Sequence, residues 1–173
     1  MDQKKLWQTK WKKMPSKSPP NNFAIRAYHV IKQGKYQTLL DLGCGNGRDS
    51  LFFARKGLHV IAVDFSESGP RQLRKQAAEK KLANLEVVRQ DISQLKFKPN
   101  SFDVIYAHLS LHYFTDKATK RIFNQLHNLL KKDGLLFVKC KSTNDMLYSR
   151  GRKLEEDMYE FRGHVRHFLT ENT

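Results

Sequence analysis

Short apolar runs recur along the middle of the chain and are separated by segments with helical spacing. The runs occupy residues 38–42, 58–63, 85–88, 102–107 and 135–140. Apolar runs of this length, bounded by turn residues, are typical of buried strands. Strands separated by helices indicate parallel βαβ units with right-handed crossovers. We therefore expect an α/β fold, a doubly wound parallel sheet with helices on both faces and ligands at the carboxyl ends of its strands.

The intervening segments with helical spacing lie at about residues 47–57, 67–82 and 116–131. Thr115 is a suitable N-cap for the last helix. Its apolar stripe consists of Ile122, Phe123, Leu126, Leu129 and Leu130. Pro70 has no N–H, so the preceding helix is expected to begin near Ser68 with Pro70 in its first turn.

The beginning of the chain has a different pattern. A helix over residues 3–14 places Leu6, Trp7, Trp11 and Met14 on one face and lysines on the other. Prolines follow, so residues 1–20 are interpreted as a basic amphipathic helix and a proline-rich linker. Residues 21–34 have an asparagine cap, apolar spacing and a terminal glycine, which predict the first helix of a domain over residues 21–173, with its core at 36–141.

The tail, residues 142–173, carries mixed charges and predicts at most one short helix, near residues 153–160. The run at 135–140 is then left as an edge strand, and such edges invite association. We expect either that C-terminal strands are missing or truncated, or that a partner covers this edge, for example a second copy in a homodimer.

Composition narrows the class of protein. A chain of 173 residues with 39% apolar residues suits one globular domain. No apolar run approaches the length of a membrane span, and the N-terminus is charged and contains no secretory apolar region, so a cytoplasmic location is predicted. Cys44 and Cys140 match no zinc or redox spacing, which favours reduced cytoplasmic thiols. The net charge of +15 suits nucleic acid, anionic lipid, an anionic small substrate or only a basic surface.

A glycine-rich bend, LLDLGCGNGRDS, spans residues 39–50. Gly43, Gly45 and Gly47 follow the first predicted strand and open a helix. Glycine lets a ligand approach the backbone closely, and the helix start offers N–H groups to a carboxylate or phosphate. A dinucleotide fingerprint requires a further glycine where this chain has Arg48, so a nicotinamide enzyme is the least favoured alternative.

Three aspartates end three consecutive predicted strands: Asp41, Asp64 and Asp91. The carboxyl ends of parallel strands share one edge of the sheet, so these acids are expected to surround one ligand. Asp64 suits two ribose hydroxyls and Asp91 suits an exocyclic amine. A carboxylate as close to the bend as Asp41 would repel a pyrophosphate. The pattern therefore predicts a nucleoside ligand without phosphate.

This combination resembles the class I S-adenosylmethionine-dependent methyltransferases over residues 36–141. The stretches LLDLGCGNG, VDFS, QDI and FDVIYAHLSLHYF are similar to the first four motifs of that family, and LLKKDGLLFVKCKS to its fifth-strand region. The resemblance implies a Rossmann-like sheet in the order 3-2-1-4-5, S-adenosylmethionine as cofactor and S-adenosylhomocysteine as product. LGCGNGRDS and LSLHYF are most similar to a small-substrate branch that includes tellurite-resistance and thiopurine-type methyltransferases.

The resemblance also implies which residues bind the cofactor: Asp41, Gly43, Cys44, Gly45, Asp64, Phe65, Asp91, Ile92 and Ala107. Asp64 would take the ribose and Phe65 would flank the adenine. Asp91 and the Ile92 amide would read the adenine edge. The remaining residues would lie along the methionine part.

The substrate side is expected in the segment after the fourth strand. The candidate catalytic residues there are His108, His112 and Tyr113. His112 is interpreted either as a substrate-facing base or donor, or as a histidine that only satisfies local backbone groups. His164 and His167 either close over the same pocket or are exposed tail residues, and the exposed position is the favoured expectation. Arg48 either binds an anionic acceptor or pairs near Asp49.

Absent motifs narrow the methyl acceptor. Residues 107–114 lack the Asn/Asp-Pro-Pro-aromatic motif of nucleobase amino methylation, and neither a Pro-Cys nucleophile nor a carboxylate cluster for a metal is evident. We expect a small, soft or anionic acceptor, methylated by in-line displacement. The alternatives are an RNA methyltransferase that uses the +8 charge of residues 1–40, and a catalytically silent cofactor-binding partner subunit. The N-terminal helix is a lid, a packing helix, or a contact to nucleic acid or a membrane surface.

Overall fold

The structure is a computed structural model that describes residues 3–13 and 18–170. Its helices are α1 (Gln3–Lys13), α2 (Asn22–Ile31), α3 (Arg48–Arg55), α4 (Ser68–Glu79), the 3-10 turn η1 (Ile92–Gln94) and α5 (Asp116–Leu129). Its strands are β1 (Thr38–Leu42), β2 (His59–Asp64), β3 (Leu85–Arg89), β4 (Phe102–His108), β5 (Leu130–Lys139), β6 (Arg152–Glu155), β7 (Met158–Phe161) and β8 (His164–His167). Met14 and Pro15, predicted to end the first helix and begin the linker, lie outside the described residues.

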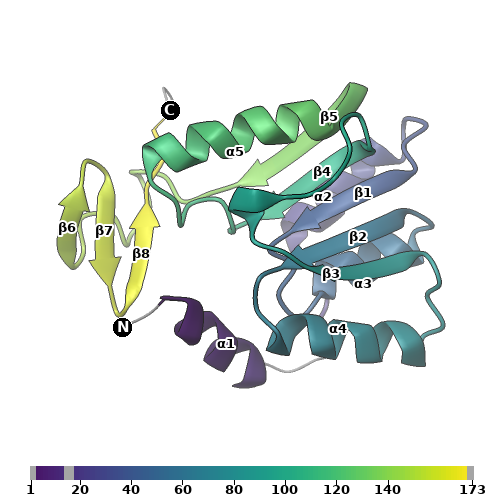
Figure 1. Ribbon diagram of the computed structural model, residues 1–173, viewed down its shortest axis with the longest axis horizontal. Coiled ribbons are helices and arrows are strands. Elements are labelled where there is room, and N and C mark those ends of the chain that lie inside the picture. The colour runs from purple at the N-terminus through teal and green to yellow at the C-terminus, as the bar shows by residue number, and fades with distance from the viewer. Residues whose placement is uncertain (1–2, 14–17, 171–173) are drawn as a thin grey trace.

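The main sheet has five parallel strands in the order β3-β2-β1-β4-β5 (Figure 1). This confirms the predicted fold class and strand order. The winding direction reverses between β1 and β4, so the carboxyl ends of these strands flank the switch point where ligands of such sheets bind. β5 begins earlier than predicted, at Leu130, because Leu130 already pairs with Phe102 of β4. The register then shifts, so that the next pair is Val104 with Leu135.

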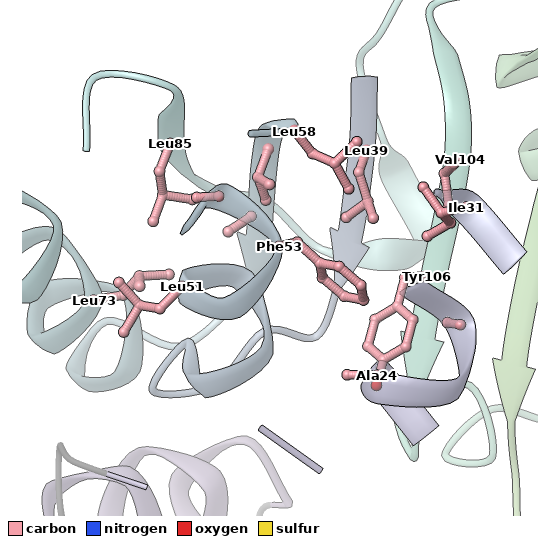
Figure 2. Packing of buried hydrophobic residues seen from close by; sticks show 14 of the residues in the cluster. Ala24, Ile31, Leu39, Leu51, Phe53, Leu58, Leu73, Leu85, Val104 and Tyr106 are labelled. Carbon is pink, nitrogen blue, oxygen red and sulfur yellow. The ribbon is translucent and has the colours of Figure 1, made fainter. Parts of the chain in front are cut away.

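Alternate residues of each strand face the two apolar layers that cover the sheet. One layer packs α2, α3 and α4 on the sheet, with Phe53 and Tyr106 in edge-to-face contact near its centre (Figure 2). The opposite layer packs α5 and η1, through side chains that include Ile122, Leu126 and Ile92. Neighbouring residues of β1 and β4 enter opposite layers, as the period of a strand requires.

The helix boundaries follow the capping residues. The Asn21 side chain accepts a hydrogen bond from the Ala24 N–H at 2.9 Å, and Thr115 accepts one from the Ala118 N–H at 3.4 Å. These side chains satisfy N–H groups that have no partner within the helix. α4 begins at Ser68 with Pro70 in its first turn, as predicted.

The expectation of at most one short helix in the tail is wrong. β6, β7 and β8 form a separate antiparallel sheet in that order, beyond the end of α5 in Figure 1. Met158 and Phe168 are buried, and Phe168 packs against the rings of Tyr148 and Tyr159. The strands were missed because each is four residues long and β6 is exposed throughout, so little apolar alternation marks them.

β5 is an edge strand of the main sheet, as expected, and the small sheet does not extend it. Leu136 on this edge has 37% of its surface exposed. The predicted homodimer through this edge stays a prediction. In the part of the chain that the structure describes, no helix has the length and apolar character needed to cross a membrane.

Candidate functional site

A cavity of about 570 Å³ opens at the carboxyl ends of β1, β2 and β4. This volume is within the usual range for small-molecule sites. Its wall contains four aspartates, several aromatic rings and two long basic side chains. The lining residues are Trp7, Lys10, Trp11, Ser18, Asp41, Gly43, Cys44, Asn46, Arg48, Asp49, Asp64, Phe65, Asp91, Ile92, His108, Leu109, Ser110, Tyr113 and Phe114.

The glycine bend is fastened to the end of β2. The N–H groups of Gly43 and Cys44 both donate to the Val63 carbonyl, at 2.8 and 3.0 Å. The Asp64 carboxylate accepts from the Gly45 N–H at 3.0 Å and from the Ser66 N–H at 2.8 Å. Both glycines have positive φ, which a side chain would strain. Asp64 is only 4% exposed, and its two oxygens are therefore fixed at the cavity wall.

Asp41 lies near the end of β1 and is a buried part of the cavity wall. The Ser50 hydroxyl donates to its Oδ2 at 2.5 Å. Burial, together with the nearby carboxylates of Asp49 and Asp64, raises the pKa of Asp41 to about 8. A cation placed beside this carboxyl would favour its ionised form. Asp41 therefore suits a positively charged ligand group.

Asp49 is a fourth acid of the cavity, which sequence reasoning did not assign to the ligand. Its carboxylate accepts from the Asn21 backbone N–H at 3.0 Å, from the Asn21 side-chain amide, and from the Tyr106 hydroxyl at 3.2 Å. Burial raises the pKa of Asp49. Arg48 Nε lies 3.9 Å from Asp49 Oδ1, while the Arg48 side chain also lines the cavity. Both interpretations of Arg48 therefore remain open.

Most of the residues implied for the cofactor lie around this one cavity. Phe65, Asp91, Ile92, Cys44 and Gly43 line it together with Asp41 and Asp64. Asp91 accepts from the Ser93 N–H at 3.0 Å and the Ser93 hydroxyl at 2.7 Å, which holds its carboxylate at the start of η1.

Two of the implied residues are covered instead. Gly45 lies beneath the Trp11 ring, and a Cβ built on it would stand 2.4 Å from Trp11 Cζ2. Ala107 is fully buried within the layer beside α5. Both lie behind the wall of the cavity in this conformation.

The three candidate catalytic residues are placed differently. His108 and Tyr113 line the cavity. Burial, followed by Lys139 and Arg48, lowers the pKa of His108 to about 4, so its imidazole is neutral at neutral pH. His112 is 0% exposed and lies outside the cavity wall, with its ring tilted by 37° against the Tyr113 ring and the ring centroids 4.3 Å apart. Among these residues, His108 is the one whose neutral imidazole faces the cavity.

His164 and His167 are not exposed, so that expectation is wrong. β8 lies against the segment that follows β4, and the His167 N–H donates to the His112 carbonyl at 2.9 Å. His167 is buried, and the His164 ring lies 5.3 Å from the ring of Trp7. The small sheet therefore supports one side of the cavity.

α1 covers the cavity and lies between α4 and the small sheet (Figure 1). The Ser68 hydroxyl donates to the Gln8 carbonyl at 2.8 Å, and the Gln72 amide donates to the Trp11 carbonyl at 2.5 Å. Trp7 stacks on Trp11 at 5.9 Å and meets Tyr113 edge-on at 5.2 Å. These contacts match the lid and packing interpretations of this helix.

His112 is expected to make the fold sensitive to acid. Neither of its ring nitrogens has a hydrogen-bond partner among the described residues, and burial, then Lys141 and Arg166, lowers its pKa to about 3. The unfolded chain titrates near 6.5, so the stability from the neutral ring is complete above that pH and is lost as pH falls toward 3. In His112→Leu, the loss of unfolding free energy between about pH 7.5 and about pH 5 should shrink by about 2 kcal/mol.

Urea unfolding at the two pH values measures this difference. His59→Leu, at an exposed position in β2, is the matched control and should leave the acid loss of the parent unchanged. If His112→Leu and the parent lost the same unfolding free energy between the two pH values, His112 would not be a source of the acid sensitivity.

The comparisons with known proteins agree with this geometry. The family model described as "Methyltransferase domain" matches residues 39–134. An uncharacterized chloroplastic methyltransferase of Arabidopsis thaliana is 32% identical over 112 residues, which cover 61% of this chain and 32% of that protein. A mitochondrial arginine-hydroxylase of Homo sapiens is 30% identical over 128 residues, which cover 74% of this chain and 34% of that protein. The chain thus spans about a third of the length of these relatives.

Solved structures share the same fold. The CcbJ methyltransferase from Streptomyces caelestis has a TM-score of 0.70 at 22% identity, covering 86% of this chain and 62% of that one. A coclaurine N-methyltransferase bound to N-methylheliamine and S-adenosylhomocysteine has a TM-score of 0.57 at 25% identity, covering 65% of this chain and 33% of that one.

Proposed function

Because the chain belongs to the methyltransferase-domain family, we propose that it binds S-adenosylmethionine and transfers its methyl group to a small-molecule acceptor. The observation that carries this proposal is the gathering of Asp41, Asp49, Asp64 and Asp91 on one cavity with aromatic walls. S-adenosylmethionine offers an ammonium, a sulfonium, ribose hydroxyls and an adenine amine, and each of these suits a carboxylate.

The residues of the cavity fit this cofactor. Asp41 and Asp49, whose pKa values are raised by burial, would be stabilised in their charged forms by the cationic methionine end. Asp64, fixed by two backbone N–H groups, would take the ribose, and Asp91 with the Ile92 amide would take the adenine. The buried Ser110 hydroxyl at the cavity wall has no partner among the described residues. A pyrophosphate would meet four acids here, which disfavours a dinucleotide.

When bound, the cofactor supplies an electrophilic methyl group on a sulfonium. The chain's own residues would orient the acceptor and exclude water, with Trp7 and Trp11 of α1 covering the cavity. His108, neutral at neutral pH, would accept a proton at its unprotonated ring nitrogen from an acceptor that arrives protonated. A thiolate acceptor would need no such base.

The acceptor is proposed to be small because α1 and the small sheet enclose the substrate side of the cavity. We also keep the likeness to the tellurite-resistance and thiopurine-type branch as part of this proposal, on the stretches LGCGNGRDS and LSLHYF. RNA as acceptor, the silent partner subunit and the cytoplasmic location stay predictions from the sequence.

A transfer assay tests the function. The purified chain is incubated with methyl-labelled S-adenosylmethionine together with one of two kinds of acceptor. One set of reactions contains a panel of small thiols, amines and carboxylates, and the other contains total RNA. Label in a small molecule, dependent on the chain, is the expected result. Label in the RNA alone would replace the acceptor class, and S-adenosylhomocysteine binding without any transfer would favour the silent subunit.

Gly69→Ala is expected to weaken binding of S-adenosylhomocysteine at least tenfold. A Cβ on Gly69 would stand 2.4 Å from the Gly45 carbonyl oxygen, so α4 or the glycine bend must move. A misplacement of this size in a binding site commonly costs about 10-fold to 100-fold. Binding is measured by calorimetric titration.

Gly57→Ala is the matched control for Gly69→Ala. Gly57 has φ +91 and open space around its Cβ position, so alanine there strains the backbone without touching the bend. The control should lose about 1 kcal/mol of stability and keep its affinity. Equal affinity in both variants would show that the packing of α4 on the bend does not matter for the cofactor.

A further inference from the structure

Three basic side chains from α1 and β8 meet beside the cavity, outside the segment that the family model matches. Lys10 Nζ lies 4.3 Å from the centroid of the Trp7 ring. The Trp7 ring also contacts the rings of Tyr113 and His164. Arg166 lies two residues beyond His164 on the same strand. The contacts of Trp7 therefore join α1, β8 and the segment after β4.

Arg166 is incompletely satisfied. Its Nη1 donates only long hydrogen bonds, at 3.4 Å to the Phe161 carbonyl and at 3.5 Å to the His164 carbonyl. Its Nε is buried without a hydrogen-bond partner among the described residues, and so is Nδ1 of His164. Buried polar atoms without partners are uncommon in proteins, so this cluster beside the cavity has unused hydrogen-bonding capacity.

The basic groups face one another without an acid between them. Partial burial and then Arg166 lower the pKa of Lys10. Burial, then Arg166 and Lys10, lower the pKa of His164. In the described part of the chain, no carboxylate forms an ion pair with Lys10 or Arg166.

Tyr113 connects this charge to the cavity. Its ring lines the wall, and burial raises its pKa, while the charge of Arg166 and then a hydrogen bond to Arg166 act in the opposite direction. Lys10 lines the same wall, whereas Arg166 lies behind it. An anionic group in the cavity would therefore contact Lys10 and the Tyr113 hydroxyl, with Arg166 holding that hydroxyl in place.

We propose that Lys10 and Tyr113, with Arg166 as a positioning residue, form a subsite for an anionic oxygen group, a carboxylate or phosphate, on the methyl acceptor. The proposal rests on the proposed function and names the class of acceptor. The aromatic rings of Trp7 and Phe114 at the same wall favour an acceptor with a planar apolar body. The substrate class is thus a small aromatic acid or phosphate ester.

The test uses the full chain and its two tryptophans, both of which line the cavity, as fluorescent reporters. Protein saturated with S-adenosylhomocysteine is titrated with benzoate, with phenyl phosphate and with neutral benzamide. Both anions should bind at least tenfold more tightly than benzamide, since a charge-assisted contact contributes about this much. Whichever anion binds more tightly identifies the group. Equal binding of all three probes would overturn the proposal.

Variants locate the subsite. Lys10→Met and Tyr113→Phe should each reduce the affinity for the more tightly bound anion about tenfold. The affinity of each variant for S-adenosylhomocysteine should stay within about twofold of the parent. Arg166→Met should reduce the affinity for the same anion, and Arg166→Lys should retain part of the affinity that Arg166→Met loses. Lys12→Met, at an exposed position of α1 outside the cavity wall, is the matched control and should have no effect.

Two outcomes separate this proposal from the proposed function. If Lys10→Met reduced the affinity for S-adenosylhomocysteine as strongly as the affinity for the anion, the Lys10 charge would bind the cofactor's carboxylate. The proposed subsite would then be rejected. If S-adenosylhomocysteine failed to bind while benzoate still bound to the free protein and lost affinity in Lys10→Met, the cofactor assignment would fail and the anion site would stand.

Discussion

Replacing Asp64 with alanine is expected to reduce the affinity for S-adenosylhomocysteine by about 100-fold or more. The carboxylate holds the Gly45 and Ser66 N–H groups, and its remaining acceptor positions face the cavity. Charge-assisted hydrogen bonds contribute roughly 1.5–3 kcal/mol each, so the loss of two to ribose hydroxyls predicts this effect. Calorimetric titration of the variant measures it directly.

Two further variants sharpen this result. Asp64→Asn keeps one side-chain oxygen and should lose less affinity than Asp64→Ala. Glu86→Ala removes an exposed acid from β3, outside the cavity, and should bind like the parent. Parental affinity in Asp64→Ala, with an unchanged melting temperature, would place the ribose elsewhere.

Phe53→Ala is expected to destabilise the fold by about 3–5 kcal/mol, the usual range for an aromatic side chain removed from a core. Phe53 is fully buried between α3 and the sheet, with its ring 5.0 Å from Tyr106 and 5.4 Å from Phe52 (Figure 2). A domain of this size has only about 5–15 kcal/mol of stability, so the variant should unfold at much lower urea concentration.

Phe53→Leu is the control for this substitution. It keeps a large apolar side chain and should lose less than half as much stability, because the remaining cavity is smaller. Similar unfolding midpoints for Phe53→Ala and the parent would mean that this layer of the core does not hold the sheet.

The main sheet could be predicted because its signals are local. Each buried strand is a continuous apolar run, and Asn21, Thr115 and Pro70 mark helix starts through their own side chains. The three aspartates were found because a carboxylate at the end of an apolar strand stands out from its neighbours. Their gathering on one cavity follows from the parallel arrangement of the strands.

Other features depend on contacts between distant segments and leave no local signal. Asp49 follows Arg48 at a helix start and looks like an ordinary first-turn acid, yet Asn21 and Tyr106 bury it at the cavity. The small sheet has strands too short for a period to be counted, and Phe168 is buried by the rings of Tyr148 and Tyr159, which lie earlier in the chain. No pattern along the chain distinguishes His112, which is buried, from His108, which faces the cavity.

The division of the site has a functional consequence. The acids that suit the cofactor lie within residues 39–134, which match the family model. The groups proposed to select the acceptor come mainly from α1 and β8, on either side of that segment. The proposed cofactor site and the proposed acceptor subsite would then be supplied mainly by different parts of the chain.

Calorimetric titration of the purified chain with S-adenosylhomocysteine and, separately, with NAD tests the central claim most directly. The carboxylates of the cavity predict micromolar or tighter binding of S-adenosylhomocysteine and no binding of NAD. Binding of NAD, or of neither ligand, would contradict the assignment of this cavity to S-adenosylmethionine.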